Sequence, residues 1–294
     1  MKRTLLNSGP IKSLALAVAV LAGFAFGTAG AAARPRNPSA VIDVFPGPNA
    51  IASALAGASS GDTLNIHTGI YNEHFTVSKA DITFQAAGDG PVTVDGGCTS
   101  TWTINVTADG VTITGLRVIG GNFYAITFNG VDGGGVFSSS VRDTCGGAEY
   151  GINVFNSGSL KILGNRASGF GDAGIYIGAV NFGRSTFKAN DSFGNNRGII
   201  VENSASGTIL VVSNNTHDND TTGIWITNSD GVTVRANTVT NNNNSGIQLD
   251  IFSDNNTVTH NTVSGHRYDL ANDGGTGNCW LDNVYTTSKG NISC

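Results

Sequence analysis

Apolar residues recur at a nearly fixed interval through the second half of the chain. A Gly-Ile pair occurs five times, with steps of 23, 24, 25 and 23 residues. The pairs are Gly151-Ile152, Gly174-Ile175, Gly198-Ile199, Gly223-Ile224 and Gly246-Ile247. A period in the low twenties that carries only short apolar segments is typical of a solenoid whose turns are made of strands. The pattern therefore predicts an all-β fold, a single-stranded parallel β-helix.

Apolar and other side chains alternate after each of these pairs. Ile152 and Val154 flank Asn153, and period-two alternation places the first two in the core and the asparagine on the outer face. The equivalent outward positions of the five repeats are Asn153, Tyr176, Ile200, Trp225 and Gln248. The tyrosine, isoleucine and tryptophan of this row are expected to form an apolar strip, which either faces solvent or lies beneath a loop.

A second short apolar segment follows about ten residues later in each repeat and leads into an asparagine. These residues are Asn165, Asn190, Asn214, Asn237 and Asn261. Their spacing predicts that they stack in consecutive coils, with amides bonded along the solenoid axis. Because asparagine tolerates a left-handed backbone, we expect these residues to form tight corners.

The first 33 residues differ from the repeats. Three basic residues precede an apolar run from Leu14 to Phe26, and Ala31-Ala32-Ala33 follows. This order predicts a signal peptide over residues 1–33, since the apolar run is too short for a membrane span. We therefore expect an exported protein, secreted or periplasmic, without a membrane span.

The remaining chain divides into three predicted parts. Residues 34–91 are expected to form an N-terminal cap and the first coils, because apolar residues at helical spacing over residues 50–58 predict a short helix that covers the end of the solenoid. Residues 92–271 contain the β-helix repeats. Residues 272–294 are expected to form a C-terminal capping segment.

Four cysteines, an even count in an exported chain, predict disulfides, and three pairings are possible. Cys279 and Cys294 both follow the last clear repeat, so a bridge between them would close the end of the stack and stabilise it by about 3 kcal/mol. Cys98 and Cys145 then form the other pair. They are separated by about two coils, roughly 10 Å, so a loop must bend to join them.

The charge of the chain bears on its partners. Loss of the three basic residues of the leader would change the formal net charge from −5 to −8. No cluster rich in lysine and arginine occurs along the sequence, which argues against a nucleic acid partner. A strongly anionic polysaccharide is expected to be repelled unless a cation bridges it.

The residues from Ile51 to Glu73, which include Gly61-Asp62-Thr63-Leu64, carry a family resemblance together with the repeats. They resemble the secreted right-handed parallel β-helix proteins of the pectin-lyase-like superfamily, and the repeats also resemble the NosD-type periplasmic group. The segment from Gly277 to Cys294 is similar to the disulfide-closed end of many such proteins. The resemblance implies a right-handed coil, as parallel crossovers prefer. It implies no single activity, because the superfamily includes lyases, epimerases, hydrolases, adhesins and accessory proteins.

Motifs of the hydrolases and epimerases are missing from the sequence, which lacks Gly-His-Gly, Arg-Ile-Lys, adjacent Asp-Asp and Asp-Pro-His. A weaker set precedes the Gly-Ile pairs. In register, Glu149 and Asp172 would lie about 5 Å apart, with Arg197 one coil further. The two carboxylates could hold Ca²⁺ beside a catalytic Arg197, with Tyr150 and Tyr176 flanking the site. The alternative is chance pairing of charges on solvated corners.

Aromatic side chains suggest a binding role. Tyr176 and Trp225 suit the apolar face of a sugar, with Asn153 and Gln248 bonding its hydroxyls. The leading interpretation is a protein that binds or processes extracellular polysaccharide or cell-surface glycan. A Ca²⁺-dependent uronate lyase and a structural or adhesive surface protein are alternatives. The five histidines are scattered over different coils, no cofactor beyond Ca²⁺ is predicted, and the oligomeric state stays open.

Overall fold

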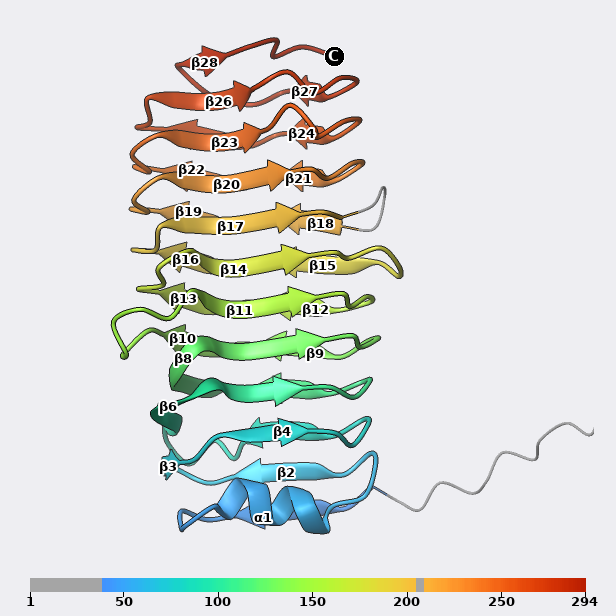
Figure 1. Ribbon diagram of the computed structural model, residues 1–294, viewed down its shortest axis with the longest axis vertical. Helices are drawn as coiled ribbons and strands as arrows, with labels where there is room; N and C mark the ends of the chain where they lie inside the picture. The colour runs from blue at the N-terminus through green and yellow to red at the C-terminus, as the bar shows by residue number, and fades with distance from the viewer. Residues whose placement is uncertain (1–38, 205–208) are drawn as a thin grey trace, which may run out of the picture. The chain divides into compact units, whose positions relative to one another are not determined.

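The computed structural model describes residues 39–204 and 209–294. These residues belong to one compact unit in which short strands stack coil upon coil (Figure 1). The predicted signal peptide, residues 1–33, lies outside the described residues. Among the described residues, no helix has the length and apolar character needed to cross a membrane.

Three parallel walls of strands surround the core. The first wall is an 11-stranded sheet in which the neighbours along the axis are about one repeat apart in the sequence. Its strands are β1 (Val41–Val44), β2 (Thr63–Ile66), β5 (Thr83–Ala86), β7 (Thr112–Thr114), β9 (Gly135–Phe137), β12 (Lys161–Leu163), β15 (Ser185–Lys188), β18 (Ile209–Val212), β21 (Thr233–Arg235), β24 (Thr257–Thr259) and β27 (Cys279–Leu281).

The second and third walls are joined by two long strands, β6 (Val92–Val106) and β8 (Leu116–Asn129), which run through both. The other strands of the second wall are β3 (Gly69–Asn72), β10 (Ser140–Arg142), β13 (Arg166–Ser168), β16 (Asp191–Phe193), β19 (Asn215–His217), β22 (Thr238–Thr240) and β25 (Thr262–Ser264). The other strands of the third wall are β4 (Phe75–Val77), β11 (Tyr150–Phe155), β14 (Ala173–Gly178), β17 (Arg197–Glu202), β20 (Thr222–Thr227), β23 (Ser245–Leu249), β26 (Tyr268–Asn272) and β28 (Ser288–Lys289). The predicted parallel β-helix is confirmed.

The repeat isoleucines are stacked in register in the third wall. Ile152 pairs with Ile175, and the series continues through the remaining three repeats. All five isoleucines are fully buried. The glycine before each lies where a Cβ atom would clash: on Gly151 it would lie 2.4 Å from the carbonyl oxygen of Gly174, and on Gly174 it would lie 2.1 Å from the Ser192 hydroxyl oxygen. The Gly-Ile pair thus lies at the beginning of a strand of the third wall, and its isoleucine is buried in the core.

The predicted asparagine ladder is present between the first and second walls. The Asn165 side-chain amide donates to Asn190 Oδ1 at 3.1 Å, and the same Oδ1 accepts the Asn165 backbone N–H at 2.9 Å. This pattern repeats along the axis and reaches Asn283, one coil beyond the prediction. The ladder satisfies buried amides that no strand partner reaches.

The left-handed backbone conformation that we expected for these asparagines is wrong. None of the predicted five adopts a positive φ; the residue just before each does. The left-handed residues are Gly164 (φ 67), Ala189 (φ 55), Ser213 (φ 54), Ala236 (φ 54) and His260 (φ 57). The left-handed residue forms the corner, and the asparagine that follows it points inward. The asparagine is therefore needed for the hydrogen bonds of its side-chain amide, and not for its ability to adopt a left-handed backbone.

A second asparagine ladder was not predicted from the sequence. Asn195, Asn219 and Asn242 stack at the corner between the second and third walls, bonded side chain to side chain at 3.1 and 2.8 Å. The ladder ends on the buried His266, whose Nε2 lies 3.0 Å from the Asn242 amide, while its Nδ1 lies 2.9 Å from Asp269. Desolvation by burial lowers the pKa of His266, so the ring is neutral, accepting at Nε2 and donating at Nδ1.

The predicted cap helix is confirmed as α1 (Ala50–Gly57), which buries Ile51 and Leu55 over the end of the core. Glu73 from the next coil accepts the first N–H groups of α1 at 3.0 and 2.9 Å. At the other end Lys79 Nζ donates to the carbonyls of Leu55, Ala56 and Ala58 at 2.6 to 2.8 Å. A negative group at the N-terminus and a positive one at the C-terminus both suit the helix dipole.

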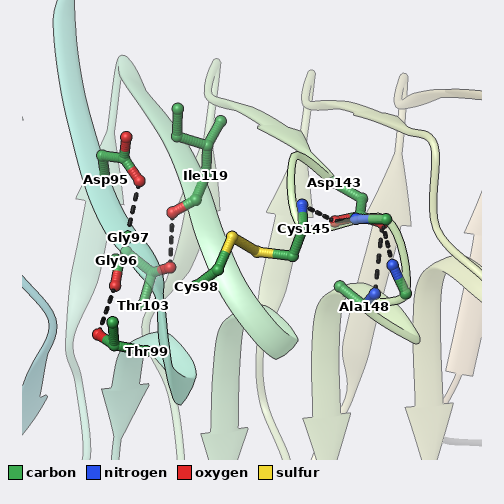
Figure 2. The surroundings of a disulfide bond; sticks show 12 residues. Asp95, Gly96, Gly97, Cys98, Thr99, Thr103, Ile119, Asp143, Cys145 and Ala148 are labelled. Carbon is green, nitrogen blue, oxygen red and sulfur yellow. Dashed lines mark hydrogen bonds between the residues drawn. A yellow bond between two sulfur atoms is a disulfide. The ribbon is translucent and has the colours of Figure 1, made fainter.

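Both predicted disulfides are present. The Cα atoms of Cys279 and Cys294 are 4.2 Å apart, and those of Cys98 and Cys145 are 5.6 Å apart. Figure 2 shows how the loop from Asp143 to Ala148 bends back toward β6 to make the second bridge. The Asp143 carboxylate accepts the backbone N–H groups of four residues of this loop at 2.7 to 3.3 Å. The loop is therefore fixed by a carboxylate as well as by the disulfide.

Candidate functional site

The predicted outward row of the third wall is in register, from Asn153 through Tyr176, Ile200 and Trp225 to Gln248. The sequence left open whether the apolar residues of this row face solvent or lie beneath a loop, and in the structure the middle one is buried. Ile200 is only 1% exposed, whereas Tyr176 and Trp225 are partly exposed. Ile200 lies between these two residues in the paired row.

The aromatic residues instead gather over the coils that precede the strip. The Tyr124 and Tyr150 rings stack at 5.8 Å between centroids, and Tyr150 lies 4.6 Å from Tyr176. Phe123 contacts both Tyr124 and Tyr150 at 4.7 and 5.9 Å. Together with Trp102 these rings line a groove of about 410 Å³, here called the aromatic groove. Asn105, Thr127 and Asn153 supply polar groups along its floor, and Asn129 and Phe155 complete the lining.

Sequence reasoning missed Trp102, Phe123, Tyr124 and Phe155. The strands that carry the first three lack the Gly-Ile pair, since Thr103-Ile104 and Ala125-Ile126 stand in its place. Their isoleucines are nevertheless in register with Ile152. A search for any small residue before an isoleucine would have extended the repeat by two coils and found these rings.

A charged pair lies at one end of the aromatic groove. Tyr150 Oη donates to Asp172 Oδ2 at 3.0 Å, and Asp172 Oδ1 forms an ion pair with Arg197 Nη1. The Arg197 guanidinium in turn lies over the Trp225 ring, 4.7 Å from its centroid. The structure thus brings Asp172 and Arg197 together, as the spacing predicted, and ties both to aromatic rings.

The tyrosines of the groove are neutral donors. Burial, followed by the charge of Asp172, raises the pKa of Tyr150. Burial and a 2.7 Å hydrogen bond to Glu202 likewise raise the pKa of Tyr176. Neither phenol is poised to act as a base near neutral pH. The rings therefore offer apolar faces and hydroxyl groups rather than acid–base chemistry.

The proposed Ca²⁺ site at Glu149 and Asp172 stays a prediction. The two residues lie on neighbouring coils, with the Asp172 N–H donating to the Glu149 carbonyl at 3.0 Å. Each carboxylate oxygen of Asp172 already has one partner, Tyr150 or Arg197, so a cation bound there would share the carboxylate with the Arg197 guanidinium. Within residues 39–204 and 209–294, no group of three or more His, Cys, Asp or Glu side chains is arranged to hold a metal ion.

The remaining predicted binding residues divide between two places. Asn153 lies in the aromatic groove, where its amide donates to Thr127 at 2.7 Å. Trp225 and Gln248 lie two and three coils beyond Tyr176, outside that groove. Gln248 donates to Asp273 at 2.7 Å and lines a smaller hollow near Tyr268.

Together, these stacked coils of parallel strands define a parallel β-helix protein. Residues 125–293, more than half of the chain, match the family described as "Periplasmic copper-binding protein (NosD)". The chain belongs to that family, which is periplasmic by its description, and its paired cysteines fit an oxidising compartment.

Solved structures show the same fold. Pectate lyase Pel9A is 12% identical, with a TM-score of 0.60 over 86% of this chain and 79% of that one. XylC, solved in complex with xylose, is 12% identical, with a TM-score of 0.66 over 83% of this chain and 69% of that one. No curated protein matches the sequence. These TM-scores establish a shared fold. Because the identities are low, the activity has to be argued from the chain's own residues.

The described residues do not fit a copper site of the kind that the family description names. All four cysteines are in disulfides. His67 and His217 each have both ring nitrogens within 3.1 Å of aspartate oxygens, and His266 is buried between Asn242 and Asp269. His260 Nε2 lies 3.6 Å from Asp282, and in the described part of the chain neither His74 nor His260 belongs to a group of three or more His, Cys, Asp or Glu side chains that could hold a metal ion. Copper prefers clustered imidazole or sulfur ligands, which this arrangement lacks.

Proposed function

We propose that this protein is exported and binds the sugar chains of an extracellular polysaccharide or cell-surface glycan in the aromatic groove. The observation that carries the proposal is the set of rings on consecutive coils: Trp102, Tyr124 and Tyr150 are paired in register along the axis. Successive coils are about 5 Å apart, so the rings form an extended platform rather than a closed pocket. Such a platform suits a chain of sugars.

The chemistry of the groove favours a sugar over a purely apolar ligand. Ring faces can pack against the C–H face of a pyranose, while Asn105, Thr127 and Asn153 along the floor can bond its hydroxyls. The tyrosine hydroxyls are protonated near neutral pH, as an ordinary phenol is, and burial raises their pKa further, so a neutral or a weakly acidic glycan meets no phenolate charge.

Binding can be measured by calorimetric titration with xylan and pectin oligosaccharides of defined length. We expect Trp102→Ala and Tyr124→Ala each to weaken binding about tenfold, because each removes one ring of the platform. Tyr285→Ala is the matched control, since Tyr285 is a 41% exposed aromatic residue at the C-terminal end. Equal affinity of all three variants and the wild type would refute the proposal. Absence of glycan binding together with association of the protein with cells would favour the structural or adhesive alternative.

A second candidate function, which is catalytic, rests on the Asp172–Arg197 pair at the end of the groove. In a uronate lyase, Arg197 would take the proton beside the sugar carboxylate, while Glu149 and Asp172 would hold Ca²⁺. An unsaturated product absorbs in the ultraviolet, so pectate and alginate incubated with and without Ca²⁺ test the idea directly. Absorbance that rises with the wild type but not with Asp172→Asn would support a lyase. No rise in any condition would leave binding alone.

A further inference from the structure

A second, larger groove of about 830 Å³ lies on the outer face of the second wall. Arg117, Arg142 and Arg166 line it, and no Asp or Glu is among its lining residues. The three arginines come from β8, β10 and β13, which are consecutive coils. We call this feature the arginine groove. It is basic, although the whole chain carries a formal charge of −5.

Strand register explains why the arginines converge. Arg117 and Arg166 share one outward row, with Ser140 between them. Arg142 lies two residues along the strand from Ser140, in the neighbouring outward row. Coils are about 5 Å apart, so the three guanidinium groups form a triangle across three coils rather than a single file.

Two of the three arginines have no anionic partner. The side chains of Arg117 and Arg142 are exposed, and these side chains take part in no ion pair or hydrogen bond within the described ranges 39–204 and 209–294. Asp143, next to Arg142 in the sequence, is unavailable because its carboxylate accepts four backbone N–H groups of the disulfide loop (Figure 2). The guanidinium of Arg142 is therefore left free by the same contacts that fix the loop.

The third arginine is held in place. Arg166 Nε donates to Asp191 at 3.2 Å, and its guanidinium lies over the Phe193 ring, 4.6 Å from the centroid. The opposite side of that ring stacks on His217 at 5.1 Å. Arg166 thus forms a fixed edge of the groove, while Arg117 and Arg142 supply the unpaired charge. Ser140 lies between Arg117 and Arg166 in their row, and Ser168 and Thr93 add hydroxyl groups elsewhere along the groove.

We propose that the arginine groove binds the carboxylate groups of an acidic polysaccharide, as a second binding surface separate from the aromatic groove. Guanidinium groups bind carboxylates through paired hydrogen bonds, and the serine and threonine hydroxyls suit the hydroxyls of the same sugars. A nucleic acid is disfavoured, because its affinity comes largely from many phosphate contacts with clustered lysine and arginine, and this groove offers three arginines. Three arginines in an otherwise acidic chain support a ligand of sparser charge.

The proposal does not depend on the function proposed for the aromatic groove, and the same titrations can separate the two. The probe is an oligogalacturonate of defined length, titrated at about 50 mM salt with a chelator present, so that no cation bridges protein and ligand. Its methyl ester, which keeps the sugar but removes the charge, is the matched ligand. We expect the acid to bind at least tenfold more tightly than the ester.

The variant Arg117→Gln/Arg142→Gln should weaken binding of the acid at least tenfold and leave binding of the ester unchanged. Arg235→Gln is the control, because Arg235 is an exposed arginine on β21 of the first wall. Trp102→Ala should weaken binding of the ester, if it binds, without removing the preference for the acid. Equal binding of acid and ester, or an unchanged affinity in the double variant, would overturn the proposal. Tighter arginine-dependent binding of an oligothymidylate would also overturn it, in favour of a nucleic acid.

Discussion

The aromatic groove and the arginine groove occupy the same few coils, yet they differ in every chemical respect. β8 contributes Tyr124 to one and Arg117 to the other. In both, inward residues are apolar and in register, and only the outward residues differ. Further along the second wall the outward rows continue as short polar residues such as Thr238 and Thr262. The comparison shows that the regular coil sets the spacing of the side chains, whereas the residue types at the outward positions of a few coils set the chemistry of each groove.

The two grooves meet at the corner that carries the Cys98–Cys145 disulfide. The loop from Asp143 to Ala148 follows β10, which lines the arginine groove, and precedes β11, which lines the aromatic groove. In Figure 1 this loop projects from the stack between β10 and β11. The disulfide therefore lies on the segment that joins strands of the two surfaces.

Loss of that link is expected to have the largest effect on both grooves. Cys98→Ser/Cys145→Ser removes a bridge of sequence separation 47, which should lower the free energy of unfolding by about 4 kcal/mol. Denaturant unfolding measures this loss, and glycan titration should show weaker binding at both grooves. Cys279→Ser/Cys294→Ser is the control, since it should cost about 3 kcal/mol and leave both affinities intact. Wild-type affinities in the first variant would show that the loop supports neither surface.

A break in the Asn165 ladder should affect the wall of the arginine groove more than the wall of the aromatic groove. Asn190→Ala leaves the backbone N–H of Asn165 and the carbonyl of Ile162 without their buried partner, at a cost of about 2–3 kcal/mol. Because this ladder adjoins the second wall, hydrogen exchange should accelerate around Arg166 more than around Tyr150. Asn243→Ala, at an exposed asparagine, should change stability by less than about 0.5 kcal/mol. Equal acceleration on both walls would mean that the coils loosen as a unit.

Salt should affect the two surfaces differently. Raising the salt concentration from about 50 to 200 mM should weaken acid binding at the arginine groove about fivefold, because exposed charges are screened. Binding of a neutral xylan oligosaccharide at the aromatic groove should change less than twofold. Calorimetric titration at both concentrations measures the contrast. A parallel loss for both ligands would argue for a single shared site.

The smallest expected effect lies far from both grooves, at His266. Burial lowers its pKa below the ordinary value of 6.5, so the unfolded chain takes up the proton more readily. The stability that neutral His266 provides is therefore present above pH 6.5 and is lost as the pH falls towards the folded-state pKa. Thermal unfolding between pH 7 and pH 5 measures it, and His266→Gln should flatten the dependence. Affinities at both grooves should be the same in this variant.

Several features could be predicted from the sequence because they depend on local spacing. The Gly-Ile period determined the coil length, since each isoleucine must reach the core and each glycine lies where a Cβ atom would clash with a neighbouring atom. The recurrence of Asn165 and its equivalents predicted their ladder, and the cysteine positions led to the correct pairs. Even Asp172 and Arg197 were placed correctly, because a regular coil turns a spacing of 25 residues into contact.

Only the tertiary structure decided which outward residues act together. Arg117, Arg142 and Arg166 are scattered along the sequence and fall in two different rows, so no cluster is visible until the coils stack. Ile200 belonged to the right row but is buried, whereas its row neighbours Tyr176 and Trp225 are partly exposed. The physical reason is that the repeat constrains inward positions through packing, whereas the exposure and partners of an outward side chain depend on what the coils above and below happen to carry.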